Sequence, residues 1–152
     1  MGVSTCDDET FSVYKRDWSA RLQNIKLIDD MNTVIGQSVL AQLDEAYGYL
    51  RLDLAEIEAA KDKTEAIIRQ NERSKAMGKN EDDRKKNATD LLENFPIGDE
   101  PTQTIDMYEM SRLMNHRYTI IKAFVDIINN KQQRLITMSG FLKLEKDLMP
   151  NS

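Results

Sequence analysis

The residue types that most often carry out chemistry are sparse in this sequence. His116 is the only histidine and Cys6 the only cysteine, so a nucleophile activated by histidine would depend on His116 alone. Its sequence neighbours, Asn115 and Arg117, supply no nucleophile. A histidine in this setting is more often an ordinary helix residue than a catalytic base. We therefore predict that the chain is not an enzyme, and we assign no role to Cys6 or His116.

Spacings typical of metal and phosphate sites are also missing. The sequence has no HExxH, no CxxC and no pair of Glu-x-x-His segments. The acidic run at 81–83 is dense, but Glu81 and Lys85 have the i,i+4 spacing of an ion pair on a solvated helix face. Gly78 and Gly98 stand alone and form no glycine-rich phosphate loop. We predict neither a metal nor a cofactor.

A cluster of cations is the feature most consistent with binding. The segment 61–90 carries nine Lys or Arg against seven Asp or Glu, although the net charge of the whole chain is −5. The predicted nucleic-acid-binding residues are Arg69, Arg73, Lys75, Lys79, Lys85 and Lys86. In a monomer they would be a solvated hairpin tip, but repetition in an oligomer would create a strong field for phosphates. No aromatic residue lies among them, so sequence-specific stacking on bases is not expected.

Composition and periodicity predict the elements that carry these residues. Charged residues make up 31% of the chain and aromatics 7%, a profile that favours long helices. Residues 1–8 are predicted to be a disordered tail. Phe11, Tyr14, Trp18, Leu22 and Ile25 then follow steps of three and four, which predicts a first amphipathic helix. The start lacks a signal-peptide pattern and no apolar run is long enough to span a bilayer, so a cytoplasmic protein is expected.

The middle of the chain predicts a long helix and a short one. Leu43, Tyr47, Leu50, Leu54 and Ile57 form one stripe of a helix over about 38–77. Gly36 predicts a bend before it, and Gly78 a cap after it. Asn80 is a favourable N-cap for a short helix that ends near the pair Leu91 and Leu92. Pro96, Gly98 and Pro101 then predict an acidic loop.

The last helix, over about 104–148, has the strongest periodicity. Its seam residues predicted to form an oligomer interface are Met114, Ile121, Phe124, Ile128, Leu135 and Met138. Arg117, Lys131 and Glu145 interrupt this seam every fourteen residues. Either their stems lie along the seam while the charges reach solvent, or they set register and oligomer state.

These elements predict one all-α fold: a long antiparallel helical hairpin with a shorter N-terminal helix and a short helix in the connection. It would form a single helical domain over 9–149. So long a hairpin has a thin core and would leave a broad apolar side exposed. Self-association is the simplest way to cover that side, so a homo-oligomer is expected.

This layout resembles the UvsY-type recombination mediators of bacteriophages over roughly residues 38–145. The matching parts are a long helix ending in the basic stretch 67–79, a short helix from Lys85 and Lys86 to the Leu pair, an acidic loop and a long final helix. The resemblance implies a ring-forming protein that binds single-stranded DNA, with Arg69, Arg73 and Lys75 facing it. It also implies a recombinase and a single-strand-binding protein as partners, in the host cytoplasm if the chain is phage-encoded.

Two other classes fit the same sequence. One is an oligomeric structural or assembly protein, such as a phage scaffold, connector or packaging component. The other is an inhibitor whose acidic surface binds a partner by imitating nucleic acid. Retention of single-stranded DNA that falls with salt separates the mediator from both alternatives.

Overall fold

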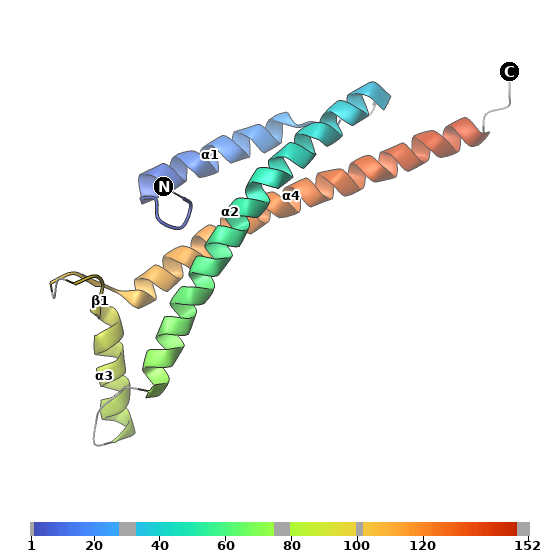
Figure 1. Ribbon diagram of the computed structural model, residues 1–152. Helices are drawn as coiled ribbons and strands as arrows, with labels where there is room; N and C mark the ends of the chain where they lie inside the picture. Colours follow the sequence, from blue (N-terminus) through green and yellow to red (C-terminus); the bar gives the residue numbers. More distant parts are fainter. Residues whose placement is uncertain (1, 28–32, 75–79, 100–101, 149–152) are drawn as a thin grey trace. The chain divides into compact units, whose positions relative to one another are not determined.

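The computed structural model describes residues 2–27, 33–74, 80–99 and 102–148, except the side chains at 33, 73, 74, 139 and 141–147. Its helices are α1 (Asp8–Asn24), α2 (Thr33–Ser74), α3 (Glu81–Glu93) and α4 (Met107–Leu148), as Figure 1 shows. Two short strands, β1 (Phe95–Pro96) and β2 (Thr104–Ile105), complete the order. Helices account for 83% of the structure, and α2 packs against α4. The predicted all-α helical hairpin is confirmed.

Contacts along the chain group into two compact units, and α2 and α4 contribute to both. The first unit contains Thr5–Leu54 and Ile120–Ser152, and the second contains Gly2–Ser4 and Ala55–Thr119. In the first, Gln132 of α4 donates a hydrogen bond to Asp44 of α2 (2.9 Å). The prediction of a single helical domain over 9–149 stays a prediction.

Each unit has its own apolar core. In the first unit, Leu22 of α1, Leu43 and Leu50 of α2, and Ile121 and Ile128 of α4 are buried. The core of the second unit contains Ile57 of α2, Leu92 of α3 and Met114 of α4. Burial of these large side chains is the main favourable contribution to folding, because each removes apolar surface from water.

Helix α1 begins with a regular cap. The Asp7 side chain accepts a hydrogen bond from the backbone N–H of Thr10 (2.7 Å), and Asp8 and Glu9 occupy the first turn. Such acids are favourable there because they face the positive end of the helix dipole. The residues before the cap are ordered as well, since Val3 and Cys6 are buried. The expectation of a disordered tail at 1–8 is therefore corrected for residues 2–8, since Asp8 begins α1, and residue 1 lies outside the described residues.

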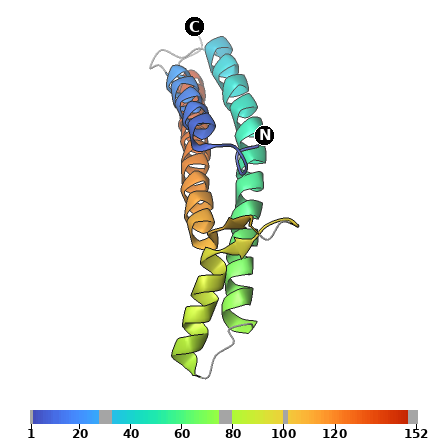
Figure 2. The same cartoon turned by 90° about the vertical axis from the view of Figure 1, so that its left-hand side faces the viewer.

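Helix α3 starts as the sequence predicts. The Asn80 side chain accepts from the backbone N–H of Asp83 (2.8 Å), which satisfies one of the unpaired donors of the first turn. The segment after α3 is not only a loop, because β1 and β2 pair in antiparallel fashion. Figure 2 shows this ribbon between α3 and α4. Gly98 lies in its turn with φ 71°, a left-handed conformation that glycine adopts without steric cost.

The bounds of α2 differ from the prediction at the N-terminal end. The helix begins at Thr33 and includes Gly36, where a bend or break was expected. A Cβ placed on Gly36 would lie 4.0 Å from Leu135, so this turn is close to α4. Packing of this kind can outweigh the roughly 1 kcal/mol by which glycine disfavours a helix. The predicted cap Gly78 lies outside the described residues.

Candidate interaction surfaces

The predicted nucleic-acid-binding cations are exposed where the structure describes them. Arg69 lies on α2, and Lys85 and Lys86 lie on α3, all in the second unit. The side chain of Arg73 and the residues Lys75 and Lys79 lie outside the described residues. The three cations whose side chains the structure describes are thus carried by two helices.

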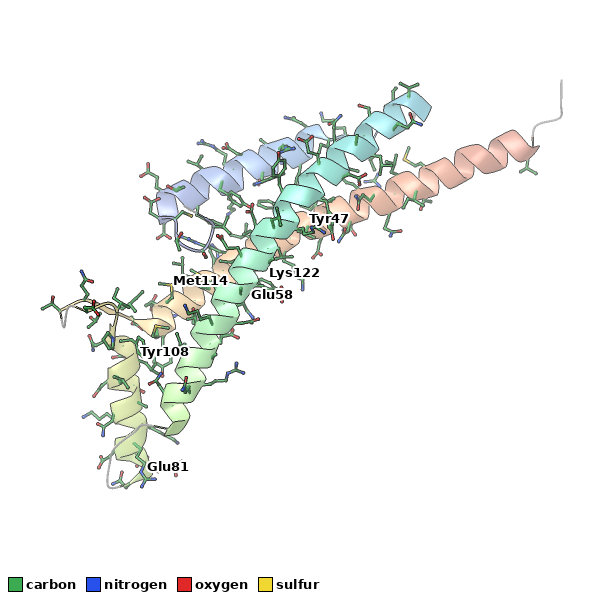
Figure 3. The ribbon with its side chains drawn as sticks, viewed as in Figure 1. Tyr47, Glu58, Glu81, Tyr108, Met114 and Lys122 are labelled. Atoms are coloured by element: carbon green, nitrogen blue, oxygen red, sulfur yellow. The ribbon has the colours of Figure 1, made fainter. Side chains whose placement is uncertain are left out.

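Acidic residues share the surface of α3 with these cations. Within Glu81–Glu93 the exposed cations are Arg84, Lys85 and Lys86, whereas the exposed acids are Glu81, Asp82, Asp83, Asp90 and Glu93. Glu81, labelled in Figure 3 near the start of α3, lies 3.5 Å from the ammonium group of Lys85. Three cations against five acids give α3 a negative balance, which opposes binding of a phosphate backbone to this helix alone.

An aromatic hydroxyl joins α4 to α2 in the same unit. Tyr108, labelled in Figure 3 at the start of α4, donates a hydrogen bond to the Glu72 carboxylate (2.9 Å). Burial raises the pKa of Tyr108, and the hydrogen bond to Glu72 raises it further. A tyrosine is protonated at neutral pH at its ordinary pKa, and an upward shift leaves it so, and therefore the hydroxyl remains the donor in this contact.

The residues predicted to form an oligomer interface lie mainly in the core of their own chain. Met114, Ile121, Phe124, Ile128 and Leu135 are buried, and Met138 is half-buried. The surface of the five buried residues is covered by the chain's own elements, whereas part of Met138 remains accessible. The assignment of these six residues to a subunit interface stays a prediction.

Exposed apolar side chains are concentrated in the first unit. Among the described residues, nine of the eleven exposed large hydrophobics belong to it, and only Leu91 and Ile97 belong to the second. The nine are Val13, Val34, Leu40, Tyr47, Tyr49, Leu52, Ile127, Ile136 and Leu148. They lie on α1, α2 and α4, and those that are neighbours on the surface would favour a further protein contact.

Two of the three polar seam residues of α4 bind backbone carbonyl groups. Arg117 is 1% exposed and donates to the Val3 carbonyl (3.0 Å) in the second unit. In the first unit, the Lys131 ammonium group donates to the carbonyls of Leu22 (2.8 Å) and Ile25 (2.6 Å). The side chain of Glu145 lies outside the described residues. The role of Arg117 and Lys131 is thus to hold N-terminal backbone on α4, an arrangement that the seam pattern does not reveal.

Lys131 acts as a cap for α1. The last carbonyl groups of a helix have no partner within the helix, and a cation there also faces the negative end of the helix dipole. Burial lowers the pKa of Lys131, and the neighbouring charge of Arg134 lowers it as well. The two carbonyl hydrogen bonds act in the opposite direction, because they stabilise the charged form.

Replacing Lys131 by Met is expected to lower the free energy of unfolding by about 1–3 kcal/mol, because two helix-terminal carbonyls lose a charged donor. Chemical denaturation followed by circular dichroism measures this change. The control is Arg134→Met, which removes an exposed cation of the same helix and should have little effect. Equal effects of the two substitutions would contradict the capping role.

A cluster of aromatic residues joins α1 to α2, and the sequence predicts only its α1 half. Phe11 stacks on Tyr14 with ring centroids 5.5 Å apart, and Tyr14 donates a hydrogen bond to Asp53 (2.7 Å). The Arg21 guanidinium lies 4.7 Å from the centroid of Trp18 and 5.7 Å from that of Tyr49. The period of α1 predicts that the aromatic residues share a face, but Tyr49 lies outside the predicted stripe of α2.

Described residues of the first unit line a hollow of about 370 Å³, formed by Arg21, Asn24, Ile25, Gln42 and Glu45. A groove of about 190 Å³ is lined by Ser19, Leu22, Gln23, Phe124, Ile127 and Lys131 of the first unit. No three His, Cys, Asp or Glu side chains in the described part of the chain lie where they could hold a metal ion. Nor does any described helix combine the length and apolar character needed to cross a membrane. His116 is exposed on α4, and Cys6 is buried.

Comparisons with known proteins identify no relative, because no family model, curated protein or solved structure matches the chain. The resemblance to UvsY-type mediators therefore rests on the layout of the sequence alone, that is, on the order of the helices, the basic stretch and the acidic loop. The class defined by the fold is that of an all-α helical hairpin.

Proposed function

We propose that this chain is a non-enzymatic accessory protein that self-associates through the apolar surface of its first unit. The concentration of exposed large hydrophobics there is the observation that supports the proposal. Leu52 and Tyr49 of α2 are among the most exposed, and contact with another copy would remove them from water. The proposed place of action is the cytoplasm.

Replacing Leu52 by Glu is expected to shift the protein toward monomer, because a charge would have to be desolvated in the contact. Sedimentation at micromolar concentration measures the mass, and circular dichroism checks that the helices remain. The matched control is Leu91→Glu on the exposed side of α3 in the second unit. A wild-type species that sediments as a 17.5 kDa monomer would remove self-association from the proposal.

Single-stranded DNA is the partner that we propose for the second unit, with recombinase loading on DNA covered by single-strand-binding protein as the process. Exposure of Arg69, Lys85 and Lys86 supports this, and so does the resemblance of the helix layout. The acids of α3 support the alternative of an oligomeric assembly protein that binds no DNA, because they oppose phosphate binding.

A combined charge reversal at Arg69 and Lys85 is expected to weaken binding to oligo(dT) at every salt concentration, because two phosphate contacts are lost. Fluorescence anisotropy against salt measures it, with a slope of about −0.7 per phosphate contact. Arg16→Glu is the control, because Arg16 is an exposed cation of α1. If the wild-type chain does not bind single-stranded DNA at low salt, the proposed function becomes that of an oligomeric assembly protein and not of a recombination mediator.

A further inference from the structure

Residues 2–4 of the second unit are held by their backbone. The N–H of Ser4 donates to the Glu56 carboxylate of α2 (3.1 Å), and the Arg117 guanidinium of α4 donates to the Val3 carbonyl (3.0 Å). One acid and one cation thus bind neighbouring peptide groups of the same short segment. Hydrogen bonds that include a charged group are shorter and stronger than those between neutral groups.

The surroundings of Glu56 and Arg117 also favour particular side chains at positions 2 and 3. Val3 is buried, so an apolar side chain is accommodated there. A side chain on residue 2 would displace the exposed Glu56 carboxylate and disturb its hydrogen bond with Ser4, which favours glycine there. Backbone hydrogen bonds supply affinity and side-chain fit supplies selectivity in many peptide-binding sites. The peptide pattern that fits the site is therefore glycine, followed by an apolar residue and then by any residue.

The hydrogen bond between Arg117 and the Val3 carbonyl matters for stability because Arg117 is buried. Its side chain is 1% exposed, and a guanidinium removed from water must be compensated by hydrogen bonds. The Val3 carbonyl supplies one such acceptor from a segment that is distant in sequence. Glu56, by contrast, is exposed, so it can be replaced without opening the core.

We propose that Glu56 and Arg117 form a peptide-binding site, occupied here by Gly2–Ser4 of the same chain. The ligand class is an extended peptide with glycine followed by an apolar residue, bound mainly through its backbone. Occupation by the chain's own segment competes with any such peptide in solution, because a tethered segment has an effective concentration that can reach the millimolar range. This inference is independent of self-association and of DNA binding.

The test releases the segment in the full chain and offers it back as a peptide. Val3→Lys should displace residues 2–4, because it would place a charge in a buried site near Arg117. The probe is a fluorescent peptide of residues 2–7, acetylated on Gly2 and with Cys6 replaced by Ser. The variant is expected to bind it at least about tenfold more tightly than wild type. Val13→Lys, at an exposed valine of α1, is the matched control and should bind like wild type.

Selectivity is measured with the same anisotropy assay. Adding Glu56→Ala to the Val3→Lys variant should weaken peptide binding roughly tenfold, the loss of one charged hydrogen bond. A peptide with lysine at the valine position should not bind. The proposal is overturned if Val3→Lys keeps its helicity and binds the valine peptide no better than wild type, or binds both peptides equally.

If the Val3→Lys variant does not fold, amide hydrogen exchange in a different variant tests the site instead. In the otherwise unchanged chain, Glu56→Ala should speed exchange of the Ser4 amide at least about tenfold, because its acceptor is removed. Faster exchange at Ser4 with unchanged exchange in α2 supports the site. An unchanged Ser4 rate would overturn it.

Discussion

Replacing Ile128 by Ala is expected to lower the free energy of unfolding by about 2–5 kcal/mol. Ile128 is 0% exposed in the core of the first unit, so the change removes buried apolar surface and leaves a cavity. Ile136→Ala is the matched control on the same helix, because Ile136 is 62% exposed. That substitution should change stability by no more than about 0.5 kcal/mol. Urea denaturation followed by circular dichroism measures both.

The same pair of variants tests the predicted subunit interface. If Ile128 belongs to the core of its own chain, the Ile128→Ala substitution should lower the free energy of unfolding by the same amount at every protein concentration. If it belongs to a contact between subunits, the cost should grow or shrink with concentration, because association stabilises by mass action. If the loss of stability in Ile128→Ala varies with protein concentration, Ile128 would be assigned to the subunit interface as the sequence predicts.

Replacing Leu92 by Ala is expected to have the second large effect, again about 2–5 kcal/mol. Helix α3 has thirteen residues and buries only Ala88 and Leu92 among them. Helices of that length are marginal in water by themselves, so the burial of Leu92 stabilises α3 through packing. Hydrogen exchange of the α3 amides should rise, and denaturation should show the loss of stability.

The neighbouring leucine is the control for Leu92. Leu91 is 37% exposed, whereas Leu92 is 0% exposed, although both are leucines of the same helical turn. Leu91→Ala should therefore cost clearly less than Leu92→Ala, and amide exchange in α3 should change little. Equal losses for the two variants would show that α3 is not held by the side chain that the structure buries.

The seam of α2 shows how far periodicity predicts a core. Leu43, Leu50 and Ile57 belong to the predicted stripe and are fully buried. Tyr47 belongs to the same stripe but is exposed. Positions 46 and 47 both lie between Leu43 and Leu50 on the helix, and the structure buries the smaller side chain. Ala46 is fully buried outside the stripe, and a small apolar residue gives too weak a signal to predict this.

The N-terminal residues show what periodicity omits. The acidic start at 7–9 suggests a solvated tail, yet the same residues cap α1, and Val3 before them is buried. Val3 is a single apolar residue with no repeat around it, so no pattern marks it as core. Its place depends on Arg117, more than a hundred residues away in the chain.

Local sequence determined the elements of this protein: the order of the helices, the Asn80 cap and the period of the buried leucines and isoleucines. These follow from interactions over three or four residues, which a sequence displays directly. Only the tertiary structure decided that Arg117 and Lys131 bind backbone carbonyls, and that Met114, Ile121, Phe124, Ile128 and Leu135 of α4 are buried within the chain. Both depend on contacts between residues far apart in sequence, where packing selects one partner among many that the composition allows.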